Sequence, residues 1–338
     1  MGRWSSCRSW LAWALVVCAL IAAPVTPIRS SFLWFWSCDN DRGGEVDPFW
    51  RHLAPYVFSP SANAGNRRFL TGVIPACGIN LGDALPPKGT PPAPLDRRGG
   101  FTFPCCSQLH GLSEIVNRSH ANGMQVFPLV TGYTDTGPGQ LRRFLANYSL
   151  VKRFTDALVA EAVNRDWDGY SFDWEFRGWD LADERANAAF LGQLADRMRG
   201  VGKGLSVAID NASHPNFDLH GLRAHPAVQV ITMSSYSANA TAFRQVVVDA
   251  VAVAGARSYS CGLSCSWMSW GRGTPPNAAA IAERISFLQQ HGVESVSIFG
   301  DWYSVGATND SATFVETFVP ILRRFLQGAT STSSATIA

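Results

Sequence analysis

The chain of 338 residues is 46% hydrophobic and 16% charged, which is a globular composition somewhat poor in charge. Its formal net charge of +2 argues against a nucleic-acid-binding protein, because the positive residues are scattered and form no basic stripe. Length and composition leave room for one large domain behind an N-terminal targeting segment.

The N-terminus has the pattern of a secretory signal peptide over residues 1–23. Arg3 and Arg8 form a basic start, Trp10 to Ala23 form an apolar stretch, and small residues precede Pro24. This stretch is too short for a comfortable membrane span, although an uncleaved signal anchor is the alternative. We therefore expect a protein that is secreted or delivered to a lysosome or vacuole, without membrane contact after signal cleavage.

Apolar runs with strand character alternate with helical patterns along the chain. The expected strands cover residues 32–36, 69–74, 125–130, 169–174, 205–209, 228–233, 259–262 and 295–299. The expected helices cover residues 107–123, 149–165, 181–200, 241–255, 276–292 and 311–326, and Ser149 is the expected N-cap of the second. Eight strands that alternate with helices predict an α/β protein with a single (β/α)8 barrel domain over residues 30–328.

Other features describe the segments around these elements. We expect residues 85–106, rich in Pro and Gly, to form a long loop rather than a domain, and residues 329–338 to form a disordered tail. Five Asn-x-Ser/Thr sequons and an even number of cysteines after the signal agree with a secreted, disulfide-bonded glycoprotein, with the pairing left open. The sequons begin at Asn117, Asn147, Asn211, Asn239 and Asn309, and the cysteines are Cys38, Cys77, Cys105, Cys106, Cys261 and Cys265.

The fourth expected strand runs into the segment WDGYSFDWEF, which is both aromatic and acidic. Because strand side chains alternate, the aromatic residues face one way and Ser171, Asp173 and Glu175 face the other. In a barrel the polar set points inward, with Glu175 nearest the carboxyl end, where barrels place active sites. Two neighbouring carboxylates resist ionising together, so the pKa of one of them rises. That acid stays protonated and can donate its proton to a leaving group. The alternative, a buried ion pair with Arg, lacks an inward basic residue on a neighbouring strand.

The segment from Asp168 to Phe176 resembles the signature of glycoside hydrolase family 18, the chitinase-like enzymes. Their pattern is Asp-x-x-Asp-x-Asp-x-Glu, usually with Gly after the first Asp, and the chain matches it except at Ser171. Some members, including the di-N-acetylchitobiase group, also carry a neutral residue there. The resemblance is nearest the di-N-acetylchitobiase or endo-N-acetylglucosaminidase type, and the motif falls on the fourth strand, as in the family.

The resemblance implies hydrolysis of β-linked N-acetylglucosamine by substrate assistance, an exception to the usual two-carboxylate scheme. Glu175 would protonate the leaving oxygen and later activate water, while Asp173 would orient the acetamido group and stabilise the oxazolinium ion. Ser171, also a substrate-site residue, would tune its neighbour only by a hydrogen bond. The sixth and seventh strand regions hold no acid that could be a conventional nucleophile. Only Asp210 and Asp301 remain, and Asp210 joins the substrate-binding candidates.

Softer matches add further candidates for substrate binding. Tyr236 lies near the family's sixth-strand Met-x-Tyr-Asp segment and could donate to the acetamido oxygen or be a packed core residue. Phe299 or Trp302 would close the sugar site in place of the family's eighth-strand Trp. Trp34 could be a sugar platform, although strand aromatics are more often core. Asp168, the first acid of the motif, is also included.

We therefore expect a monomeric O-glycosyl hydrolase that needs no cofactor or metal. Its partner would be an N-acetylglucosamine-containing oligosaccharide, such as a chitobiose-type core or a chito-oligosaccharide. About a dozen residues separate Cys265 from Asn277, where many chitinases carry an insertion domain, so the cleft should be shallow. The alternatives are a chitinase-like lectin, which usually loses the catalytic Glu, and a conventional β-glycanase, which lacks its second carboxylate here.

Overall fold

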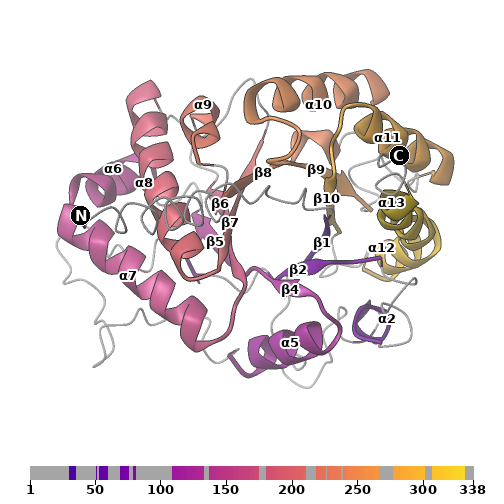
Figure 1. Cartoon of the computed structure of the whole chain (residues 1–338), viewed down its shortest axis with the longest axis horizontal. Coiled ribbons are helices and arrows are strands. Elements are labelled where there is room, and N and C mark those ends of the chain that lie inside the picture. Colours follow the sequence, from indigo (N-terminus) through magenta and orange to yellow (C-terminus); the bar gives the residue numbers. More distant parts are fainter. Residues whose placement is uncertain are drawn as a thin grey trace, which may run out of the picture.

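The computed structural model describes residues 30–35, 51, 53–59, 69–75, 79–80, 109–132, 137–174, 180–210, 218–225, 227–236, 239–265, 277–300 and 307–331. Within these ranges, parallel strands form a central ring that helices surround (Figure 1). The expected signal peptide, the loop 85–106, Glu175 and Trp302 lie outside the described residues.

The strands pair in parallel, and their order around the sheet is β3-β5-β6-β7-β8-β9-β10-β1-β2-β4. A parallel sheet requires crossover connections, which explains why helices separate most strands in the sequence. The strands are β1 (Ser30–Phe35), β2 (Gly72–Pro75), β3 (Ile79–Asn80), β4 (Gln125–Val126), β5 (Leu129–Gly132), β6 (Gly169–Trp174), β7 (Gly204–Ile209), β8 (Val228–Thr232), β9 (Tyr259–Ser264) and β10 (Ser295–Phe299).

The sheet closes on itself through the segment 125–132, which contains β4 and β5. Its first half pairs with β2, and the backbone N–H of Phe127 donates to the carbonyl of Val73 at 3.0 Å. Its second half pairs with β6, where Leu129 lies opposite Ser171. Strand β2 pairs with β4, and β3 pairs with β5. We therefore count β2 and β3 as one strand of the barrel, and β4 and β5 as another. The result is an eight-stranded barrel, which confirms the fold prediction.

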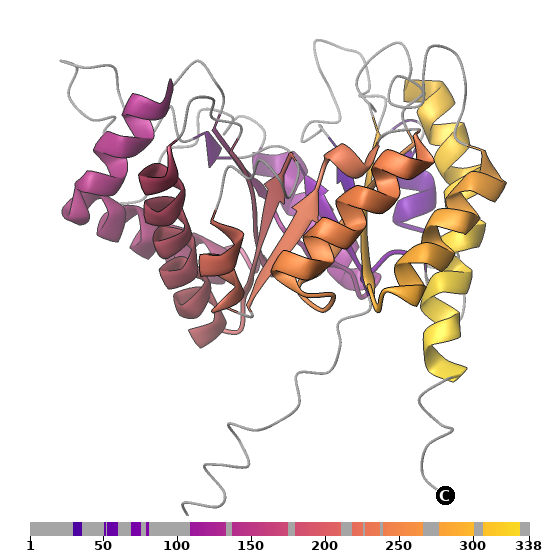
Figure 2. The ribbon, with the colours of Figure 1, turned by 90° about the horizontal axis from the view of Figure 1, so that it is seen from above.

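Helices cover the outside of this barrel (Figure 2). The six expected helices are present with ends that shift by a few residues, and α8 has the expected bounds, whereas α2, α6 and α9 were not expected. A short π-helix, η6, divides the last expected helix, and α13 continues to Ser331, so the expected tail begins too early at residue 329. The helices are α2 (Ala54–Val57), α5 (Leu109–Ala121), α6 (Gly137–Ala146), α7 (Tyr148–Asn164), α8 (Leu181–Gly200), α9 (Leu219–Arg223), α10 (Ala240–Ala254), α11 (Ala278–Gln290), α12 (Ala307–Thr313), η6 (Phe314–Phe318) and α13 (Val319–Ser331). None that the structure describes is both long and apolar enough to cross a bilayer.

Short polar side chains fix where several helices begin. The Asp180 side chain accepts from the backbone N–H of Ala182 and of Asp183. The Asp183 side chain in turn accepts from the backbone N–H of Asp180, which completes a capping box at α8. Asn147, not the expected Ser149, caps α7 by accepting from the N–H of Leu150 at 3.1 Å. Asn147 is an exposed sequon residue, and its cap uses Oδ1. Because N-glycosylation would modify Nδ2, capping and glycosylation are compatible at this position.

The alternation of strand side chains produces two apolar layers. Outside the strands, Trp174 stacks on Phe190 of α8 with ring centroids 5.8 Å apart, and the Tyr170 hydroxyl donates to the Leu158 carbonyl of α7 at 2.8 Å. This confirms that the aromatic half of the acidic strand faces the helices. Inside the barrel, a smaller apolar cluster consists of Phe32, Trp34, Ile74, Phe127, Leu129, Ala208 and Ile231.

Candidate active site

Asp173 is a buried carboxylate inside the barrel, near the carboxyl end of β6. Asp173 is only 3% exposed. In the sheet register it lies between Thr131 of β5 and Ala208 of β7. The methyl group of Ala208 occupies little space beside the carboxylate. On the other face of the strand, Trp174 is locked under α8, which fixes the direction in which Asp173 points. The position agrees with that expected from the alternation of the sequence.

Aromatic side chains gather at the same end of the barrel. Phe299 of β10 lies opposite Trp34 of β1, and the ring of Tyr236 stacks on Phe299 with centroids 5.3 Å apart and planes 9° apart. Tyr236 and Phe299 are half-buried, whereas Trp34 is buried in the inner apolar cluster. The structure thus brings two of the candidate sugar contacts together and gives Trp34 the core position that the sequence left open.

Tyr236 ends a short 3-10 helix, η5 (Ser234–Tyr236), that follows β8. Buried polar contacts hold this turn: the Ser235 hydroxyl lies 2.9 Å from the carbonyl of Thr232 and 2.7 Å from that of Gly262. A Cβ atom at Gly262 would lie 2.0 Å from the Thr232 carbonyl oxygen and 2.6 Å from the Tyr236 ring. Only glycine fits there, so a backbone position on β9 makes room for the Tyr236 ring.

Arg284 of α11 supports the same turn from the helix layer. Its Nη1 donates to the Ser235 carbonyl at 3.4 Å, and its guanidinium lies 4.5 Å from the centroid of the Phe243 ring. The side chain is buried, and this burial lowers the pKa of Arg284 to about 10. Arg284 was not among the residues expected at the site, because it belongs to an ordinary helical pattern. The available signal was its position on the apolar, barrel-facing side of α11.

We expect Arg284→Leu to lower the free energy of unfolding by about 1–3 kcal/mol, because the buried Ser235 carbonyl loses a charged donor. Urea denaturation measures the change. Arg244→Leu on α10 is the matched control, since the Arg244 side chain is 52% exposed and pairs with Glu283 at the surface. The control should change stability by no more than about 0.5 kcal/mol. Equal losses in both variants would contradict the supporting role of Arg284.

Asp168 lies at the opposite end of β6 from the candidate site. Its Oδ2 accepts from the backbone N–H of Val126 at 2.8 Å and lies 2.9 Å from Nε2 of His120. Five residues of extended chain, about 16 Å, separate Asp168 from Asp173. The placement argues against the expected substrate contact of Asp168, because its carboxylate joins β4, α5 and β6 at the amino end of the barrel.

The other expected site residues are distributed as follows. Asp210 comes directly after β7 and is exposed at the carboxyl end of the barrel. Ser171 is buried one layer below Asp173, and its hydroxyl has no hydrogen-bond partner in the described part of the chain. The expected hydrogen bond from Ser171 to Asp173 is therefore not formed. Glu175 and Trp302 lie outside the described residues.

Cys261 and Cys265 are buried free thiols at β9. Burial raises the pKa of the Cys261 thiol to about 11, so this group stays protonated near neutral pH. The two residues are not in the disulfides expected from the even cysteine count, and the other four cysteines lie outside the described ranges. Among the residues that the structure describes, no group of three His, Cys, Asp or Glu side chains could hold a metal ion.

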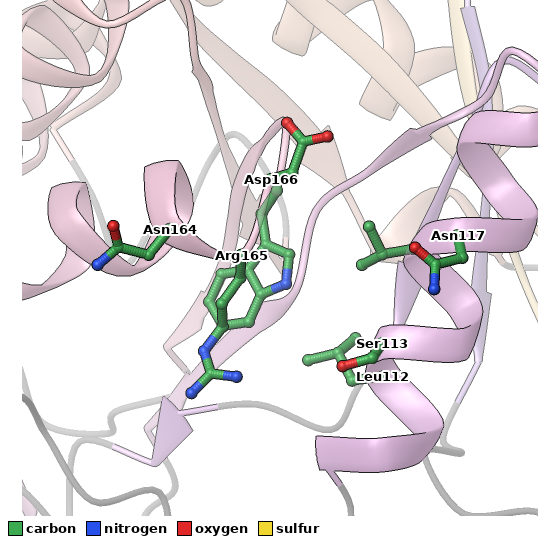
Figure 3. A pocket seen from close by; sticks show the side chains of 8 residues that line it. Leu112, Ser113, Asn117, Asn164, Arg165 and Asp166 are labelled. Atoms are coloured by element: carbon green, nitrogen blue, oxygen red, sulfur yellow. The ribbon is translucent and has the colours of Figure 1, made fainter.

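Two cavities lie away from Asp173. One, of about 310 Å³, is formed between α5 and the turn before β6, with Asn117 and Ser113 on one side and Arg165 and Asp166 on the other (Figure 3). The other, of about 330 Å³, opens at the amino end of the barrel and reaches Gln229. Neither is lined by the residues gathered at the carboxyl end, so neither is the candidate sugar site.

Neither a protein-family model nor a curated protein sequence matches the chain. Several solved structures do match its fold. A class V chitinase from Pseudomonas fluorescens Pf-5 aligns over 84% of this chain and 99% of its own, with a TM-score of 0.56 and 14% identity. Catalytic domain 2 of the Ostrinia furnacalis group II chitinase aligns over 88% and 96%, with a TM-score of 0.59 and 12% identity.

The spore cortex-lytic enzyme SleL from Bacillus megaterium QM B1551 also matches, over 88% of this chain and 75% of its own, with a TM-score of 0.57 and 13% identity. The chain has the barrel fold of these proteins. Since this barrel hosts many unrelated chemistries, the likeness fixes the architecture, and the site residues must carry any statement about function.

Proposed function

We propose that the protein is a glycosidase that hydrolyses β-linked N-acetylglucosamine by a substrate-assisted, retaining mechanism. The observation that carries the proposal is Asp173, a buried carboxylate that faces the barrel interior near the carboxyl end of β6. Barrels place their chemistry at this end, and a buried carboxylate is costly unless its surroundings compensate for it. A structure of the Ostrinia furnacalis domain, which shares the fold, contains (NAG)5, which supports this substrate class.

In this mechanism the chain supplies one proton donor and one electrostatic partner. Glu175 protonates the glycosidic oxygen while the 2-acetamido oxygen of the substrate attacks the anomeric carbon, which breaks the glycosidic bond and forms an oxazolinium ion. Asp173 orients the acetamido group and stabilises the positive charge, and Tyr236 donates to the acetamido oxygen. Glu175 then takes a proton from a water molecule whose oxygen attacks the anomeric carbon, which breaks the bond to the acetamido oxygen, opens the oxazolinium ring and gives overall retention.

The proposed substrates are short or branched, of the di-N-acetylchitobiase or endo-N-acetylglucosaminidase type. Strand β9 ends at Ser264 and helix α11 begins at Ala278, so the intervening segment is too short for a further domain that would deepen the cleft. The signal-like N-terminus and the five sequons support action outside the cell or in a lysosome. We propose that the enzyme acts as a monomer.

Turnover of a fluorogenic chitobioside tests the proposal. Glu175→Gln should reduce kcat/KM by about 10²–10⁴-fold, the usual effect of a lost general acid. Glu316→Gln, on the exposed side of the π-helix near the C-terminus, should keep wild-type activity. Glycan binding without wild-type turnover would show a lectin instead. An active enzyme that a thiazoline mimic of the oxazolinium ion fails to inhibit would contradict substrate assistance.

A further inference from the structure

Serine side chains occupy much of the barrel interior beneath the candidate site. Each is at most 2% exposed. A buried hydroxyl that lacks a hydrogen bond costs about 1–3 kcal/mol, so the partner of each one matters. The inward-facing serines of the described strands are Ser30, Ser171, Ser206, Ser260, Ser264, Ser295 and Ser297.

On the wall formed by β1, β9 and β10, these hydroxyls bond to one another. Ser30 Oγ lies 2.7 Å from Ser295 Oγ, which lies 2.9 Å from Ser260 Oγ, which in turn lies 3.0 Å from Ser297 Oγ. Gln229 of β8 joins the chain by donating Nε2–H to Ser295 at 3.0 Å. The hydroxyl groups of Ser30, Ser260, Ser295 and Ser297 on this wall therefore satisfy one another.

The wall formed by β6 and β7 differs. Ser171 and Ser206 lie opposite each other in register, and neither hydroxyl has a hydrogen-bond partner among the described residues. Their neighbours in the same row are Leu129 on one side and Gln229 on the other. Two adjacent, buried hydroxyls without protein partners make a polar site of the kind that ordered water fills in protein interiors.

Asp173 lies directly above this pair, since it follows Ser171 by two residues on the same face of β6. Neighbouring strands are about 4.8 Å apart, a spacing at which one water molecule can bridge two serine hydroxyls. A buried water makes about three hydrogen bonds, and the Asp173 carboxylate, on the same face of β6, is the candidate for the third partner. From below, the cavity that opens at the amino end extends as far as Gln229, the register neighbour of Ser206.

We propose that Ser171 and Ser206 together hold an ordered water molecule that donates a hydrogen bond to the Asp173 carboxylate. Ser206 is then a positioning residue that acts on the reaction through water, and its catalytic consequence rests on the proposed function. A hydrogen bond to an ionised carboxylate favours that form, so Asp173 keeps its charge to lower pH. The water thus stabilises the ionised Asp173. An ionised carboxylate in place of Ser171 would instead repel the charge of Asp173.

Titration of the Asp173 carboxyl carbon by ¹³C NMR tests the proposal without requiring activity. Ser206→Ala should raise the Asp173 pKa by about one unit, because the bridging water loses one of its anchors. Ser206→Thr keeps the hydroxyl and should show the wild-type titration of Asp173. It therefore serves as the second variant if Ser206→Ala disturbs the fold. Ser297→Ala is the matched control: it removes a buried inward hydroxyl from the opposite wall and should leave the Asp173 titration unchanged.

If the protein is active, the acid limb of its kcat/KM profile should move to higher pH in Ser206→Ala by the same amount and stay in place in Ser297→Ala. An inactive protein whose Asp173 titration still responds to Ser206→Ala would reject the proposed function and keep the water. An unchanged titration in Ser206→Ala, or a high-resolution crystal structure without density between the two hydroxyls, would overturn the water site even in an active enzyme.

Discussion

The Asp173→Asn variant should hydrolyse a fluorogenic chitobioside about 10²–10³-fold more slowly than the wild-type protein, a loss typical of removing a group that stabilises a transition state electrostatically. The oxazolinium ion is positively charged, and in the proposed mechanism the buried Asp173 carboxylate is the negative group that stabilises it. Asn has almost the same shape but no charge, so orientation by hydrogen bonding is weakened and electrostatic stabilisation is lost.

Stability should respond in the opposite sense to activity. Removing a buried charge also removes its desolvation cost, so Asp173→Asn should unfold at an equal or higher urea concentration. Asp156→Asn on α7 is the control, because the Asp156 carboxylate is 40% exposed and far along the chain from the site. It should keep wild-type kcat/KM. A fully active Asp173→Asn protein would remove the main support for the proposed function.

Periodicity predicted the barrel well because the alternation of residues within each strand reflects which of its two faces is covered by helices and which lies inside the barrel. The acidic strand β6 has the expected bounds, Gly169–Trp174, since its alternation reflects one face under helices and one face inside the barrel. Helix α6 (Gly137–Ala146) was missed because its Gly-Pro-Gly start has the composition of a turn. Local composition thus reports burial and periodicity, and it misleads where a turn-like start opens a helix.

The contacts at the site that the sequence did not reveal join distant positions. Asp168 was assigned to substrate by its place in the motif, but its partner His120 lies 48 positions earlier in the chain. The link between Arg284 and the Tyr236 turn spans 49 positions. Alternation gives the face of a strand on which a residue lies, and the order along the strand gives the end of the barrel, but the motif assigned Asp168 to substrate although it precedes β6. The expectation that Cys261 and Cys265 take part in disulfides was wrong for a similar reason, since an even number of cysteines says nothing about which of them lie close together.

The second large effect should appear in stability, at the residue next to Asp173. Trp174→Ala should lower the free energy of unfolding by about 3–5 kcal/mol, because it empties a fully buried site. The Trp174 ring stacks on Phe190 and meets the Phe172 ring edge-on with centroids 5.0 Å apart, so neighbouring aromatic residues lose a partner. Urea denaturation followed by far-UV circular dichroism measures the loss.

Tyr148→Ala provides the comparison for Trp174→Ala, since it also truncates a large aromatic side chain but at a residue that is 76% exposed. Its cost should stay within about 0.5 kcal/mol. At temperatures where both variants remain folded, Trp174→Ala should lose less activity than Asp173→Asn, because its side chain faces α8 and not the substrate. Because the two residues lie on opposite faces of β6, we expect the Trp174 variant to affect mainly stability and the Asp173 variant to affect mainly turnover. A Trp174→Ala protein with full stability and no activity would mean that the faces are reversed.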